Sequence, residues 1–206
     1  GFHNDCIVKA GRTELQRTTP MTMAETASIM CETIVVEAVM EQAKDRDELW
    51  AILELALTGD SQVIVDIYSR FLFESEVFMR REQAELSADE FCEIIENSQK
   101  QAYGAGLDER YLQKWMWTWK PHYYSSELAF YNFPYAFGLL FGTGLYAIYQ
   151  QRGASFVPDY KALLASTGMG DAGTLASRFG IDIRQPDFWR GSINIIRKRV
   201  ERYLAL

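Results

Sequence analysis

Apolar residues recur along this chain with the period of an α-helix, and no stretch shows the two-residue alternation of a β-strand. Gly, Pro and clusters of charged residues separate the periodic segments. The pattern predicts helices over 22–44, 47–57, 61–86, 87–103, 107–117, 126–152, 158–166, 171–178 and 186–204. We therefore expect an all-α fold, a multi-helix bundle that forms one domain over residues 1–206 without a linker or an internal repeat.

Several predicted helix ends carry recognisable signals. Ser87 stands three residues before Glu90, which is the spacing of a capping box. Thr22 is expected to cap the helix that runs to about residue 44. Gly59 is expected to end the next helix, over 47–57. The first residues also have apolar positions at helical spacing, as if the chain began within a helix.

Residues 128–151 contain no charged side chain and are numerous enough to span a membrane. Gly138 and Gly142 form a GxxxG motif, which allows helices to approach closely. However, Asn132, Pro134 and the tyrosines are spread along the stretch instead of gathering at its ends. The pattern favours a buried helix kinked at Pro134, and we expect no membrane partner.

Composition narrows the possible partners. The chain has 206 residues, of which 48% are hydrophobic and 24% charged, as is ordinary for a soluble domain. A net charge of −7 argues against a nucleic-acid partner, because phosphate binding needs a basic surface. Cys6, Cys31 and Cys92 are too few and too far apart to predict a disulfide framework or a CxxC zinc site, which favours the cytoplasm. His3 and His122 are the two histidines, so no site can be built mainly from histidines of these residues.

Glu25 and Glu32 interrupt an otherwise apolar segment. Residues seven apart lie two helical turns apart, so both carboxylates should share one face, roughly 10 Å from each other along the axis. The residues alone leave two interpretations open for Glu25. It can cap the first turn together with Thr22, or it can serve a functional site.

Four segments, taken together and in order, resemble one protein family. They are PMTMAETASIMCE (20–32), PHYYSSELAFYNFPYAFGLLFGTGLYAIY (121–149), YKALLASTGMGD (160–171) and FGIDIRQPDFWRGSINII (179–196). They are similar to segments of the zinc oligopeptidases related to oligoendopeptidase F and thimet oligopeptidase, most of all to the bacterial oligoendopeptidase F branch. The resemblance implies the C-terminal portion of a zincin-like oligopeptidase catalytic domain.

The resemblance implies roles for the two glutamates. In the family, zinc is held by both histidines of an H-E-x-x-H motif and by a glutamate on the next helix, which corresponds to Glu25. Two imidazoles and one carboxylate leave a fourth position for water. Glu32 corresponds to a glutamate behind the metal, where a carboxylate can accept the free N–H of a ligating imidazole.

The H-E-x-x-H motif itself is absent from the 206 residues. The family pattern would place its second histidine immediately before Gly1, and His3 would be a neighbouring histidine that does not bind zinc. We therefore expect residues 1–206 to be a part truncated at its N-terminus, with the missing N-terminal part as a partner. That part would carry two zinc ligands and the general base, so the 206 residues should be inactive by themselves.

The implied activity is zinc-dependent endopeptidase cleavage of short peptides. His122, Tyr131 and Tyr135 correspond to the residues of the family that hold the substrate and donate to the oxyanion, although Phe133 stands where some relatives have tyrosine. The residues alone allow a plainer interpretation, a surface loop followed by aromatic packing.

The three tryptophans of WMWTWK (115–120) could line a peptide channel or pack in the core. The alternative function is a non-catalytic all-α interaction module derived from this family.

Overall fold

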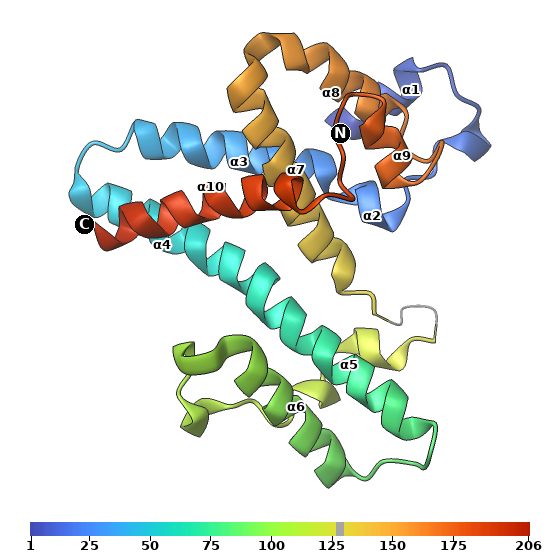
Figure 1. Ribbon diagram of the computed structural model, residues 1–206, viewed down its shortest axis with the longest axis vertical. Coiled ribbons are helices and arrows are strands. Elements are labelled where there is room, and N and C mark those ends of the chain that lie inside the picture. The colour runs from blue at the N-terminus through green and yellow to red at the C-terminus, as the bar shows by residue number, and fades with distance from the viewer. Residues whose placement is uncertain (127–129) are drawn as a thin grey trace. The chain divides into compact units, whose positions relative to one another are not determined.

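The computed structural model describes residues 1–126 and 130–206. These residues form α-helices joined by loops and short 3₁₀ turns, and none of them forms a β-strand, which confirms the predicted all-α class. The helices are α1 (Phe2–Lys9), α2 (Met21–Ala24), α3 (Thr26–Glu41), α4 (Arg46–Ser61), α5 (Ile67–Arg81), α6 (Ala88–Tyr103), α7 (Phe133–Arg152), α8 (Phe156–Ala165), α9 (Ala172–Ser177) and α10 (Pro186–Leu204) (Figure 1).

The chain divides into two compact units. Unit 1 comprises Gly1–Thr58 and Phe137–Leu206, and unit 2 comprises Gly59–Ala136. Unit 1 therefore contains α1 to α3 and α8 to α10, whereas unit 2 contains α5 and α6.

Unit 1 has a continuous apolar core in which α7 packs on both α3 and α10. The Ser192 hydroxyl of α10 donates to the Leu140 carbonyl of α7 at 2.6 Å, and Arg199 Nε of α10 donates to Glu37 Oε1 of α3 at 3.0 Å. The most deeply buried members of this core are Met23, Met30, Phe141, Leu145, Phe156, Leu163, Leu164, Leu175 and Ala176.

Unit 2 is built around the pair of helices α5 and α6. Ser87 and Glu90 form the predicted capping box at the start of α6, since the Ser87 hydroxyl accepts from the Glu90 N–H and the Glu90 carboxylate accepts from the Ser87 N–H. The apolar core of this unit is small, with Phe73, Ile94 and Ile95 buried and an aromatic margin that includes Trp117.

Two predicted helix boundaries were wrong. The segment 22–44 is two helices that meet at Glu25, and Pro20, not Thr22, is the N-cap of the first. Gly59 does not end a helix, because α4 continues to Ser61, passes through a π-helical turn at Gln62–Asp66 and leads into α5.

The predicted helix over 107–117 is also wrong, because this segment forms only short 3₁₀ turns. The Gln99 side chain accepts a hydrogen bond from the Gln113 N–H at 2.9 Å and donates to the Gln113 carbonyl at 3.2 Å. These two bonds satisfy backbone groups that an α-helix would have paired internally.

The apolar stretch 128–151 forms a helix that begins later than predicted. Residues 127–129 lie outside the described residues, and α7 starts at Phe133. Pro134 therefore falls in the first turn, where its missing N–H breaks no helical bond, and the predicted kink is absent. Of the helices in residues 1–126 and 130–206, none is long and apolar enough to cross a membrane.

Candidate functional site

Glu25 occupies the junction between α2 and α3. It is the C-cap of α2 and the N-cap of α3, and its side chain is half-buried. The Ser28 hydroxyl donates to Glu25 Oε2 at 2.9 Å and lies 3.0 Å from the Glu25 carbonyl. This serine holds the carboxylate in one orientation, which is what a metal ligand requires.

The GxxxG motif of α7 lies directly against this junction. A Cβ atom added to Gly138 would stand 2.5 Å from Glu25 Cβ, and one added to Gly142 would stand 2.9 Å from Ile29 Cβ. Only glycine permits so close an approach, because real Cβ contacts are much longer. The motif thus has a packing role inside unit 1, where it fixes the backbone of Glu25.

Glu32 lies seven residues after Glu25, within α3, and its side chain is exposed. Its role behind the metal stays a prediction. Within residues 1–126 and 130–206, no three His, Cys, Asp or Glu side chains come together in a group that could hold a metal ion.

The structure brings the other three sequence-predicted residues together in unit 2. The His122 and Tyr131 rings pack at a tilt of 31° with their centroids 4.7 Å apart, and the Tyr131 and Tyr135 rings meet edge to face at 5.9 Å. His122 belongs to a 3₁₀ turn at Pro121–Tyr124, and Tyr135 to the first turn of α7. The Nδ1 atom of His122 is buried and makes no hydrogen bond.

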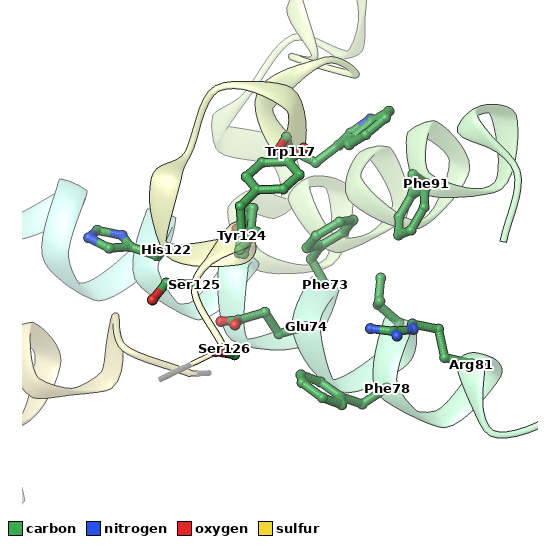
Figure 2. Close-up of a pocket in the computed structure, with 12 residues that line it drawn as sticks. Phe73, Glu74, Phe78, Arg81, Phe91, Trp117, His122, Tyr124, Ser125 and Ser126 are labelled. Atoms are coloured by element: carbon green, nitrogen blue, oxygen red, sulfur yellow. Dashed lines mark hydrogen bonds between the residues drawn. The ribbon is translucent and has the colours of Figure 1, made fainter. Parts of the chain in front are cut away.

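A pocket of about 470 Å³ lies next to His122, also within unit 2 (Figure 2). Its walls are mainly aromatic, and its polar lining comes from α5 and from the loop that carries His122. The aromatic residues are Phe73, Phe78, Phe91, Trp117, Tyr123 and Tyr124, and the polar ones are Glu74, Arg81, His122, Ser125 and Ser126. Of the three tryptophans in 115–120, Trp117 lines this pocket and stacks on Phe91 at 5.0 Å, whereas Trp115 and Trp119 are exposed.

Glu74 is the charged residue that the sequence interpretation missed. Its side chain is 5% exposed, Oε1 accepts from the Phe130 N–H at 2.9 Å, and Oε2 makes no hydrogen bond. Burial raises the pKa of Glu74, while the Phe130 N–H, the Asn132 amide and the charge of Arg70 act in the opposite direction.

Glu74 is the last of three buried charges at four-residue spacing, of which Asp66 precedes α5 and the other two lie on it. Arg70 donates to Asp66 and, at 3.0 Å, to Asn132 Oδ1, so its hydrogen bonds leave Glu74 to other partners. Asp66 ends the π-helical turn, a feature that often accompanies functional sites. The recurrence of Asp, Arg and Glu every four residues in an apolar helix was the signal that could have revealed this row.

Comparison with known proteins gives one informative match. No protein-family model and no curated protein matches the chain. A solved structure described as "Crystal structure of putative peptidase from Chlamydophila abortus" superposes with a TM-score of 0.82 at 19% sequence identity. The two chains share a fold. The match covers 98% of this chain and 33% of the other, so this chain spans about a third of the length of that protein.

Proposed function

We propose that residues 1–206 are the C-terminal helical part of the catalytic domain of a zinc-dependent endopeptidase of the oligoendopeptidase F type, which hydrolyses short peptides. The observation that carries the proposal is the fold shared, over 98% of the chain, with a protein described as a "putative peptidase". The four segments that resemble oligopeptidases agree with it independently.

Glu25 is the proposed zinc ligand of this chain. A half-buried carboxylate that a serine hydroxyl orients suits a metal that accepts oxygen ligands. Zinc, when bound, supplies polarisation of the scissile carbonyl and lowers the pKa of its water. Because H-E-x-x-H does not occur in the sequence, the proposal assigns the other two ligands and the general base to a part of the protein outside residues 1–206.

His122, Tyr131 and Tyr135 are the proposed donors to the substrate and to the oxyanion. Contact with the Tyr131 ring restrains both neighbouring rings, so a hydroxyl or imidazole N–H would donate from a fixed position. Preorganised donors of this kind stabilise the charge that develops on the carbonyl oxygen in the transition state. The short peptide substrate and the cytoplasmic location belong to the same proposal. The free thiols Cys6, Cys31 and Cys92 suit that compartment.

The test compares the protein that carries H-E-x-x-H with residues 1–206 alone. We expect the former to bind one zinc ion and to hydrolyse a quenched fluorescent peptide, to lose this activity with a chelator and to regain it with zinc. Residues 1–206 should show no turnover, because they hold one ligand and no general base. Hydrolysis that survives complete removal of zinc would overturn the proposal, and a gene without H-E-x-x-H would favour the interaction module.

A further inference from the structure

The residues on either side of Tyr131 are both held by charged side chains of α5. Glu74 Oε1 accepts a hydrogen bond from the Phe130 N–H at 2.9 Å. Arg70 Nη1 donates to Asn132 Oδ1 at 3.0 Å. Arg70, Glu74 and Asn132 are all buried. Hydrogen bonds to charged groups are stronger than neutral ones, so two firm attachments enclose Tyr131.

Phe130 has a backbone conformation that needs such support. Its φ is 55°, in the left-handed region that residues other than glycine seldom adopt. Its ring packs on Phe71 and Phe78 of α5, with centroid distances of 5.8 and 5.2 Å. A strained conformation of this kind persists only where its surroundings hold it. The hydrogen bond to Glu74 and the ring contacts therefore set the direction in which the chain enters Tyr131.

Asn132 connects the same attachment to Tyr135. Its side chain accepts from Arg70, and its carbonyl accepts from the Tyr135 N–H at 3.2 Å. The Tyr131 ring in turn lies against the rings of His122 and Tyr135, with centroid distances of 4.7 and 5.9 Å. A continuous series of contacts therefore leads from α5 to all three rings.

We propose that Arg70 and Glu74 are positioning residues for this ring cluster. They act through the backbone on either side of Tyr131 and do not themselves touch the substrate. Donors to an oxyanion are effective only when they are held in place, and a displacement of about 1 Å can cost about 100-fold in rate. The positioning follows from the contacts, whereas its catalytic consequence rests on the proposed function.

Fluorine NMR of the protein labelled with 3-fluorotyrosine tests the positioning without any turnover. The signals of Tyr131 and Tyr135 are those that disappear in Tyr131→Phe and Tyr135→Phe. Glu74→Leu removes the acceptor of the Phe130 N–H, so both signals should shift or broaden. Glu74→Gln keeps an oxygen acceptor at this position and should retain the wild-type signals. Unchanged signals in Glu74→Leu would overturn the inference.

A second variant tests the attachment through Arg70. Asn132→Ala removes one acceptor of Arg70, which keeps its hydrogen bond to Asp66, and it should move the same two signals. The matched control is Glu76→Gln on α5, whose carboxylate pairs with Arg80 at 2.7 Å and whose loss should leave both signals in place. Thermal unfolding checks that each variant is folded. Loss of folding in both test variants would also count against the inference, because positioning predicts folded proteins with displaced rings.

Kinetics of the protein that carries H-E-x-x-H test the catalytic consequence. Glu74→Leu should lower kcat about tenfold or more with KM nearly constant. In a Tyr135→Phe background the same substitution should have little further effect, because residues that act through one another are not additive.

The two measurements separate the two proposals. Displaced rings with a normal kcat would overturn the catalytic role of the tyrosines and leave the positioning intact. Undisturbed tyrosine signals would overturn the positioning and leave the zinc peptidase proposal to its own test by zinc content and hydrolysis.

Discussion

Units 1 and 2 bury side chains of different chemical character. Unit 1 encloses a broad apolar core, and its buried hydroxyls of Thr33 and Ser192 donate to helix carbonyls. Unit 2 has a small apolar core and buries the charges of Asp66, Arg70 and Glu74 beside an aromatic pocket. Within the part of the chain that the structure describes, most buried polar atoms without a hydrogen bond lie in unit 2. The comparison shows that apolar packing dominates unit 1, whereas buried charge and an aromatic pocket distinguish unit 2.

Removing a large aromatic side chain should lower the free energy of unfolding far more in unit 1 than in unit 2. Phe141 is fully buried in unit 1 and packs on Phe137 and Phe188, so Phe141→Ala should lower the free energy of unfolding by about 3–5 kcal/mol. Phe78 of unit 2 is 45% exposed, and Phe78→Ala should cost about 1 kcal/mol or less. Urea denaturation followed by circular dichroism measures both. Equal losses would refute the contrast.

Glu25→Gln should affect function far more than stability. If Glu25 is a zinc ligand, the substitution should weaken zinc binding in the intact enzyme by more than the roughly 10- to 100-fold typical of residues that only orient a ligand. The helices should remain, because the amide fits the same space. Metal analysis, peptide hydrolysis and circular dichroism check this prediction. Full zinc occupancy with normal turnover would disprove the assignment.

Tyr135→Phe tests the proposed catalytic role of this tyrosine in the protein that carries H-E-x-x-H. The ring remains, so its edge-to-face contact with Tyr131 should persist while the hydroxyl is lost. A donor that acts mainly in the transition state should lower kcat about 100-fold with KM nearly constant. Tyr131→Phe is the control and should have the smaller effect. Unchanged kcat in both variants would reduce the tyrosines to packing residues.

Gly138→Ala tests how tightly unit 1 holds Glu25. The new methyl group would stand 2.5 Å from Glu25 Cβ, so the free energy of unfolding should fall by about 1–3 kcal/mol. Gly191 of α10 has nothing within 4 Å of an added Cβ, and Gly191→Ala should instead stabilise the protein by up to about 1 kcal/mol. Thermal melting compares the pair, and equal melting temperatures would contradict the close approach.

Glu74→Gln should have a small effect on stability that depends on pH. Burial raises the pKa of Glu74 above its ordinary value of 4.5, so the native state binds the proton more tightly than the unfolded state. The wild type therefore loses stability as pH rises through the folded-state pKa. Glu74→Gln should be more stable than the wild type at pH 8 by about 1 kcal/mol, the typical effect of one buried polar group. This gain should vanish below the ordinary pKa. A constant difference across the pH range would be the contrary result.

The sequence predicted long regular helices well, but it predicted some helix ends and one irregular segment poorly. The periodic segments 87–103 and 186–204 match α6 and α10 closely, because capping signals and a regular apolar face act together. Gly59 failed as a helix end because glycine within a helix costs only about 1 kcal/mol, which packing can offset. The prediction for the segment 107–117 failed where the Gln99 side chain of α6 supplies the hydrogen bonds of the Gln113 backbone.

The candidate site was predicted only in part. The resemblance located His122, Tyr131 and Tyr135, and the structure brings their rings into contact, although nothing in it tests their roles or those of Glu25 and Glu32. Glu74 was missed because its importance arises from burial. The four-residue spacing of Asp66, Arg70 and Glu74 was visible in the sequence, but the contact of Glu74 with the distant Phe130 N–H was not.

The π-helical turn at Gln62–Asp66 changes the direction in which the side chains after it point. Each residue of an α-helix turns the next side chain by about 100°, so the one extra residue of a π-turn rotates everything beyond it by that amount. Arg70 and Glu74, which are buried, lie beyond the turn and are among the side chains that this offset rotates. Deleting a single residue from the turn would thus point the same side chains elsewhere without altering the identity of any of them. In this segment, the number of residues is as strictly constrained as their chemistry.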